Sequence, residues 1–115
     1  MTYGESLIME KCEITKDELE TWLPALRSGN FKQTVGRLFS GKGYCCLGVY
    51  FKSMGEKLKK SEQDDGMEME EYYKRIEKLI GRSFVGTLIG LNDDKVPFNK
   101  IADVIEEKFK DVLRN

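Results

Sequence analysis

WLPALRSGNFKQTVGRLFSGKGYCCLGV, residues 22–49, holds a helix end, a tight glycine turn and a run of small residues. Two extended segments, 31–40 and 43–49, flank Gly41-Lys42-Gly43, and this pattern predicts a β-hairpin. From Cys46 the chain can instead become helical, and we favour that switch, with Gly55 ending the helix. The rest of the chain is therefore interpreted around a hairpin and the helices on either side of it.

Positive charge is concentrated in this stretch and just after it. Residues 27–60 carry eight basic side chains and a single acidic one, Glu56, for a net charge of +7. The remaining residues must sum to −8, because the whole chain carries −1. Such sorting of charge in a near-neutral protein indicates an anionic ligand held at one place. The alternative is a solvated lysine face, which we favour for Lys57, Lys59 and Lys60.

Length and composition predict one ligand-binding domain over residues 1–115. The chain is 40% hydrophobic and 34% charged, which excludes a mostly disordered protein. No apolar run approaches the roughly 20 residues that span a bilayer. The first residues, MTYGESLIMEK, lack the features of a secretion signal, so we expect a cytoplasmic protein without a membrane partner. A pI near 5.6 argues against binding of a nucleic acid polymer.

The residue types also narrow the chemistry. The chain has no histidine, which removes Ser–His and Cys–His catalysis and the commonest general base, so we expect no enzyme. Neighbours such as Cys45 and Cys46 diverge in a helix or strand and chelate a metal poorly, so we interpret both as buried packing residues. Asp93 and Asp94 lack the spacing of a calcium loop. We therefore expect no metal and no cofactor.

The first helix is predicted from about Lys16. Thr15 and Glu18 have the spacing of a capping box. Its buried face is defined by residues at helical spacing: Leu19, Trp22, Leu23 and Leu26. Pro24 conflicts with a helix interior and predicts a bend or an early end, and Ser28-Gly29 is expected to stop the helix.

The other segments give a mixed pattern. Residues 1–14 are expected to form a short strand or a packed arm, and residues 56–68 a mobile loop. A helix is expected over 68–80, ended by Gly81, whereas the apolar segment 84–91 fits either a strand or a helix. Asn92 to Lys95 form a turn cluster, and a final helix is expected over 98–113. The fold class is α+β, with three to four helices and a small antiparallel β-sheet or hairpin.

Three groups of residues are candidates for binding a phosphate-bearing ligand. The first lies around the predicted helix end: Arg27, Ser28, Gly29, Phe31 and Gln33. There an arginine fork and exposed turn amides can hold phosphate oxygens, although Arg27 equally suits a helix C-terminus. The second is Arg37, near the glycine turn.

The third group contains Arg82, Phe84, Asn92, Asp93 and Asp94. Asparagine can pair with the edge of adenine, and a carboxylate can accept from a base amino group. Aromatic and arginine planes stack on bases. The alternative is a loop and helix-entry cluster without a ligand.

Several motifs together resemble a family of small proteins common in phages and prophages. They are Trp22 with Ala25-Leu26-Arg27-Ser28-Gly29, then Phe31, Gln33, Gly36 and Leu38, then Tyr44-Cys45-Cys46-Leu47-Gly48-Val49, and finally Leu91-Asn92-Asp93 before Ile101-Ala102-Asp103-Val104-Ile105. The resemblance covers most of residues 22–107. It departs from the family pattern at Phe31, where tyrosine is usual, and in an added acidic loop around Asp64.

The resemblance implies a function in anti-defence. It points to phage anti-Thoeris proteins, which sequester cyclic ADP-ribose signals without cleaving them, and some similar proteins bind cyclic oligonucleotides such as those of CBASS. Such proteins are oligomers built from dimers, with aromatic, arginine and Asn/Asp groups around the nucleotide. We therefore expect a homodimer or a larger homo-oligomer that binds a cyclic nucleotide signal in the host cytoplasm.

Two alternatives remain. One is an enzyme that degrades such a nucleotide, with Asp93 or Asp94 as general base. The other is a module that binds a host protein through its basic face. For the dimer, we expect Arg27 and Arg37 on the ligand side, and either Trp22 or the apolar stripe of residues 98–113 as shared surface, although both also fit a plain core.

Overall fold

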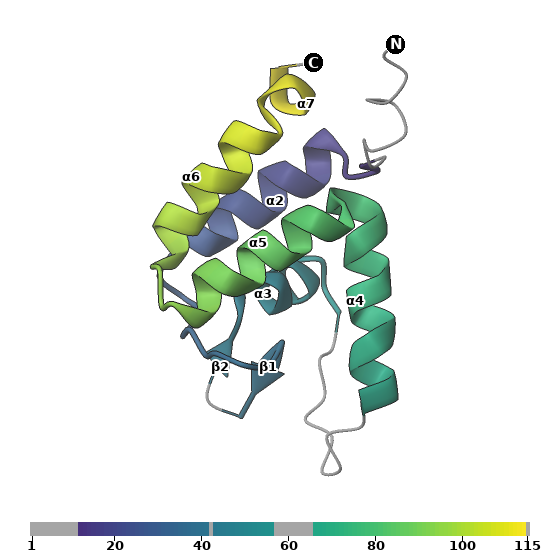
Figure 1. Cartoon of the computed structure of the whole chain (residues 1–115). Coiled ribbons are helices and arrows are strands. Elements are labelled where there is room, and N and C mark those ends of the chain that lie inside the picture. Colours follow the sequence, from purple (N-terminus) through teal and green to yellow (C-terminus); the bar gives the residue numbers. More distant parts are fainter. Residues whose placement is uncertain (1–11, 42, 57–65, 115) are drawn as a thin grey trace.

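This computed structural model describes residues 12–41, 43–56 and 66–114. These residues form six helices and one two-stranded sheet. The elements are α2 (Lys16–Arg27), β1 (Phe39–Ser40), β2 (Gly43–Tyr44), α3 (Cys46–Ser53), α4 (Gly66–Ile80), α5 (Arg82–Asp93), α6 (Phe98–Lys108) and α7 (Lys110–Arg114) (Figure 1). The α+β class is confirmed, but the expected three to four helices are too few. Most of the segment expected as a strand or arm over 1–14, and most of the loop expected over 56–68, lie outside the described residues; the last loop residues, 66–68, instead begin α4.

Helix α2 begins with the predicted capping box. The Thr15 side chain accepts a hydrogen bond from Glu18 N at 3.1 Å, and the Glu18 carboxylate accepts one from Thr15 N at 2.9 Å. Of the bend or early end expected at Pro24, the early end is wrong, because the helix continues to Arg27 and ends at Ser28, as expected. Pro24 lies on the exposed face, where water can satisfy the carbonyl that lacks its intrahelical partner.

The hairpin is real but much shorter than expected. Phe39 pairs with Tyr44, and Ser40 with Gly43, in an antiparallel register. Instead of continuing as a strand, residues 31–38 form an irregular segment that crosses on the other side of Tyr44. There Tyr44 N donates to Lys32 O, and Thr34 N donates to Tyr44 O, both at 2.8 Å. Both backbone groups of Tyr44 therefore bond to the irregular segment, and the next residue, Cys45, donates its N–H to Leu38 O at 2.8 Å.

Two glycines permit this close approach. A Cβ atom on Gly43 would lie 2.4 Å from Lys32 O, and one on Gly48 would lie 2.0 Å from Leu38 O. Any side chain at either position would therefore displace the backbone of the irregular segment. Gly48 also lies in α3, which begins at Cys46 as favoured and ends just before Gly55, whose φ is 88°.

The apolar segment 84–91, which fitted either a strand or a helix, is part of α5. Gly81, with φ 92°, makes the corner between α4 and α5. Asn92 and Asp93 form the last turn of α5 rather than a separate loop. The final helix expected over 98–113 is divided at Phe109 into α6 and α7. The helical conformation of 84–91 and the break at Phe109 explain why the helix count was too low.

The helices enclose one hydrophobic core. Helix α6 runs alongside α2, as Figure 1 shows, and α5 packs against α3, α4 and α6. The fully buried side chains include Trp22 of α2, Phe51 of α3, Ile76 of α4 and Leu88 of α5. Trp22, Ile101 and Ile105 are therefore core rather than a surface shared between copies, whereas Val104 of the same stripe is exposed. Among the described helices, none has the length and apolar character needed to cross a membrane.

Candidate functional site

A small pocket opens between the segment before β1, the start of α3, α4 and the last turns of α5. Its cavity volume is about 80 Å³. The residues that line it are Gly36, Arg37, Cys45, Tyr73, Ile89, Asn92 and Asp93. Three of these, Arg37, Asn92 and Asp93, are among the binding residues predicted from the sequence, and the fold brings them together from segments more than 50 residues apart.

Asn92 forms one wall of the pocket and is 1% exposed. Its Oδ1 accepts hydrogen bonds from Gln33 Nε2 at 3.1 Å and from Cys46 N at 3.2 Å. Its Nδ2 donates to Thr34 O at 2.7 Å. One amide side chain therefore joins the end of α5 to the irregular segment and to the first turn of α3. These contacts make Asn92 a structural residue, with its carboxamide already occupied by the protein.

Gln33 belongs to the same structural cluster. Besides its bond to Asn92, its Nε2 donates to Val96 O at 2.8 Å. The side chain thereby holds the irregular segment against the connection between α5 and α6. Gln33 is half-buried and does not line the pocket, so that it supports Asn92 from outside the cavity.

Asp93, the next residue, faces the pocket from the exposed side. Its Oδ1 accepts a hydrogen bond from Gly36 N at 3.1 Å. Gly36 has φ 79°, a conformation that favours glycine, and it directs its amide at the carboxylate. This bond holds the segment carrying Arg37 next to the last turn of α5. Asp93 and Arg37 therefore both line the pocket.

Cys45 and Tyr73 supply neutral polar groups. Burial raises the pKa of the Cys45 thiol to about 11, with a smaller contribution from the nearby Asp93 charge. Burial likewise raises the pKa of the Tyr73 phenol to about 12. Both groups therefore stay protonated at neutral pH, and each can donate a hydrogen bond. Neither has the lowered pKa of an activated nucleophile.

The first predicted group lies apart from this pocket. Arg27 Nη2 bonds Asp103 Oδ1 and Glu106 Oε1 of α6, each at 2.7 Å. Ser28 ends α2 by donating to Ala25 O at 2.7 Å, and Gly29, with φ 78°, follows it. The structure therefore uses the LRSG motif to end α2 and to attach it to α6.

Phe31 completes that group. Its ring is half-buried and meets Tyr44 edge-to-face, with 5.4 Å between ring centroids. The contact fixes the start of the irregular segment on the hairpin. Phe31 does not line the pocket.

Arg82 and Phe84 lie near the other end of α5 from Asp93. A helix of this length places its first and last residues about 16 Å apart. Phe84 is buried against Phe109, with ring centroids 5.7 Å apart. Arg82 borders a shallow surface depression with Lys74, Glu77 and Lys78 of α4. Asp94 follows α5 and is exposed, outside the pocket lining.

Four pocket residues were missed as binding residues: Gly36, Cys45, Tyr73 and Ile89. The adjacent tyrosines of α4 contained a signal, because neighbours on a helix point about 100° apart and cannot share one core face. Tyr72 indeed packs on Phe51, with ring centroids 4.8 Å apart, while Tyr73 turns to the pocket. For Ile89, no sequence feature distinguishes a pocket wall from core.

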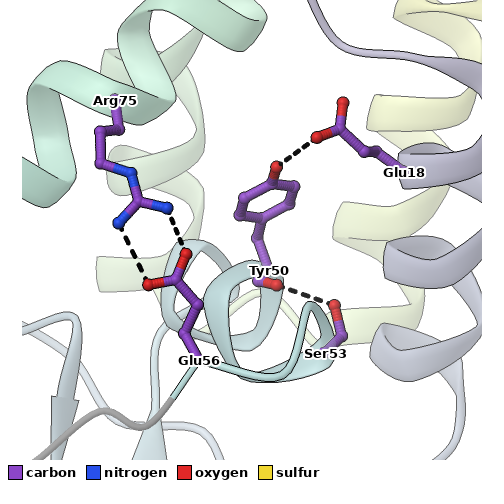
Figure 2. A network of polar contacts seen from close by, with 5 residues as sticks. All are labelled: Glu18, Tyr50, Ser53, Glu56 and Arg75. Carbon is purple, nitrogen blue, oxygen red and sulfur yellow. Dashed lines mark hydrogen bonds and ion pairs between the residues drawn. The ribbon is translucent and has the colours of Figure 1, made fainter.

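A second polar cluster stabilises the fold away from the pocket (Figure 2). The Tyr50 hydroxyl donates to Glu18 Oε2 at 2.9 Å, so the residue that caps α2 also holds α3. Burial, followed by this contact with Glu18, raises the pKa of Tyr50 well above its usual value. Arg75 of α4 forms a two-pronged ion pair with Glu56 and lies over the ring of Phe51. The cluster thus joins α2, α3 and α4.

Comparison with known proteins gives a family but no established activity. Neither the curated proteins nor the solved structures contain a match to this chain. Residues 14–81, more than half of the chain, match a protein family. The match includes the Gly36–Arg37 and Tyr73 sides of the pocket and ends before α5, which supplies Asn92 and Asp93. The chain thus belongs to the family described as Domain of unknown function (DUF8296).

Proposed function

We propose that this protein binds and sequesters a nucleotide immune signal, a cyclic ADP-ribose isomer, without cleaving it. In a phage-infected cell such a protein inhibits anti-phage defence from the host cytoplasm. The proposal combines the resemblance to anti-Thoeris proteins with one structural observation. That observation is the pocket in which Arg37, Asp93 and Tyr73 converge from three separate segments.

Each group matches a part of such a ligand. The guanidinium of Arg37 suits a phosphate, because its planar fork donates two parallel hydrogen bonds to phosphate oxygens. Tyr73 and Ile89 provide aromatic and aliphatic wall for a sugar or a base. The carboxylate of Asp93 accepts from hydroxyl or amino donors. The set is suited to a ligand that carries both negative charge and hydrogen-bond donors.

The protonation of the pocket supports binding without cleavage. The raised pKa values of Cys45 and Tyr73 leave a neutral thiol and a neutral phenol. These groups serve as hydrogen-bond donors, whereas cleavage by nucleophilic attack needs an activated thiolate or hydroxyl.

The size of the pocket supports an oligomer. A cavity of about 80 Å³ is well below the roughly 300–1,000 Å³ of pockets that enclose a whole small-molecule ligand. We therefore propose that one chain encloses part of the nucleotide and that a second copy covers the remainder. Val35, directly beside the pocket residues Gly36 and Arg37, is 41% exposed and provides an apolar contact for that copy.

A release experiment tests the function. The purified protein is incubated with 3′-cyclic ADP-ribose and passed through a size filter, and the retained fraction is then heat-denatured. Sequestration predicts that intact ligand appears only after heating. A cleavage product would instead establish an enzyme, and ligand that passes freely through the filter would overturn the proposal.

A matched pair of variants ties the result to the pocket. Arg37→Ala is expected to lose most of the retained ligand, because a phosphate then lacks its bidentate partner. Arg114→Ala removes the same charge from α7, at the opposite end of the molecule from the hairpin (Figure 1), and should retain ligand like the unmodified protein. Equal retention by both variants would place the ligand elsewhere.

A further inference from the structure

We propose that Asp93 binds the vicinal hydroxyls of a ribose, and that the protein thereby selects ribonucleotides over 2′-deoxyribonucleotides. This inference rests on the proposed function and assigns one chemical group of the ligand to one side chain. It follows from the hydrogen bonds around the last turn of α5, from the charge of that turn and from the size of the pocket.

The Asp93 carboxylate has unused acceptor capacity. An ionised carboxylate offers about four lone-pair sites. The structure occupies one of them, through the 3.1 Å bond from Gly36 N to Oδ1. The described residues supply no further hydrogen bond or ion pair to this side chain. Two neighbouring hydroxyl groups can donate to the two oxygens of one carboxylate, which is the pairing that the remaining sites allow.

The bond from Gly36 N needs one oxygen acceptor at Asp93 but not its negative charge. Asp93 is the last residue of α5, and a negative charge at a helix C-terminus opposes the helix dipole by about 0.3–1 kcal/mol. The preceding residue, Asn92, already makes the contacts that hold this turn in place. A side chain that acts against local stability beside a pocket is a candidate for ligand binding.

Asn92 is excluded from reading a base edge. Its Oδ1 accepts two bonds from the protein, and its Nδ2 donates to Thr34 O. An adenine can therefore not receive the paired amide contacts that an asparagine otherwise provides. Asp93 remains as the hydrogen-bond acceptor. A ribose offers this carboxylate two adjacent hydroxyl donors, whereas a base offers it a single amino nitrogen.

The neighbouring groups favour a sugar over a cation. Arg37 lines the same pocket, and its positive charge disfavours a metal ion at Asp93. Among the described side chains, no group of three or more His, Cys, Asp or Glu residues is placed to hold a metal. The neutral donors of Cys45 and Tyr73 suit the remaining oxygens of a sugar ring. The small cavity also suits a compact, polar group.

Calorimetric titration of matched nucleotides tests this assignment. AMP and 2′-deoxy-AMP are titrated into the full chain, with 3′-cyclic ADP-ribose as reference ligand. Loss of a hydrogen bond to a charged group predicts that 2′-deoxy-AMP binds about tenfold to a hundredfold more weakly than AMP. In Asp93→Asn the two nucleotides should bind alike. Asp94→Asn, which makes the same charge change one residue away, should keep the discrimination.

The variant is chosen to preserve the fold. Asparagine at position 93 keeps an Oδ1 acceptor for Gly36 N and changes the charge and the second oxygen. Thermal unfolding of both variants checks that each is folded. Asp93→Asn should also bind 3′-cyclic ADP-ribose more weakly than Asp94→Asn does.

The outcomes separate this inference from the function on which it rests. If neither AMP nor 3′-cyclic ADP-ribose binds, the proposed function fails and the ribose assignment with it. If the cyclic ligand binds but AMP and 2′-deoxy-AMP do not differ, the function stands and the assignment is overturned. Equal weakening by Asp93→Asn and Asp94→Asn would also overturn it, because it would indicate a general charge effect.

Discussion

Asn92 is the one buried polar residue among the described side chains. Replacing it with alanine would leave Cys46 N and Thr34 O buried without their partner. Each buried polar group that loses its hydrogen bond costs about 1–3 kcal/mol. We therefore expect Asn92→Ala to lower the free energy of unfolding by about 2–4 kcal/mol, measured by urea denaturation.

The control is the same substitution at Asn99, an exposed residue of α6. Asn99→Ala should change the free energy of unfolding by less than about 0.5 kcal/mol. If the two variants unfolded at the same urea concentration, the structural role assigned to Asn92 would be wrong.

The three cysteines should differ sharply in reactivity. Cys12 is exposed, whereas Cys45 and Cys46 are buried and burial raises the pKa of both thiols. At pH 8 we expect a disulfide-exchange reagent to modify one thiol in the folded protein and all three after denaturation. Rapid modification of all three in the folded chain would contradict the packing at the start of α3.

The raised pKa of Cys45 also predicts how stability changes with pH. Its pKa is about 11 in the folded protein and 9.0 without the protein environment. The unfolded chain loses this proton first, so the stabilisation is complete below pH 9 and is lost as the pH rises towards 11. The fall in the free energy of unfolding over this range should be smaller in Cys45→Ala, which isolates this thiol from the titration of lysines.

Single residues were predictable where their chemistry was local. The capping box of Thr15 and Glu18 was predicted from spacing, and the structure confirms it. Arg27 shows the opposite case, because an arginine at a helix end has the same local sequence whether it binds phosphate or a neighbouring helix. Its partners, Asp103 and Glu106, lie 76 and 79 residues away. Only tertiary structure distinguishes the two uses.

At the scale of elements, helices with a clear apolar period were predicted with errors of a few residues. The final helix was expected over 98–113, and the break at Phe109 was not foreseen, because the apolar stripe continues across it. For 84–91 the pattern could not separate a strand from a helix, since glycine and β-branched residues interrupt the period.

The irregular segment 31–38 was beyond local prediction. Its composition resembles a strand, yet its backbone pairs with Tyr44 through only two bonds, and further bonds to it come from Cys45, Asn92 and Asp93. Gly36, with its positive φ, interrupts any regular strand. The contacts that fix this segment come from the far end of the chain, so the pocket it borders was only partly predictable.

For the whole molecule, the burial of Trp22, Ile101 and Ile105 removes most of the surface first considered for a dimer. Val35 and Val104 are the large apolar side chains that remain exposed in the described part of the chain, at 41% and 37%. Val35 adjoins the pocket, whereas Val104 lies on α6. If a second copy covers the pocket, Val35→Asp should disrupt the association of the two copies, because that association would then bury an unpaired charge.

Light scattering measures that effect. The unmodified protein should have at least twice the 13.3 kDa mass of one chain, and Val35→Asp should approach one chain mass with weaker retention of ligand. Val104→Asp is the matched control and should keep the larger mass. A monomer that binds the cyclic nucleotide tightly at micromolar concentration would refute the shared pocket.

The burial of Trp22 has an optical consequence. Trp22 is the single tryptophan of the chain, is 0% exposed, and donates its indole N–H to Cys46 O at 3.0 Å. Its ring meets Tyr50 edge-to-face, with 5.3 Å between centroids. Its fluorescence should therefore be emitted at short wavelength in the folded chain and shift to the red when α2 separates from α3. Trp22 is thus hydrogen-bonded to the residue that directly follows the pocket residue Cys45, so its fluorescence reports on the chain next to the binding site.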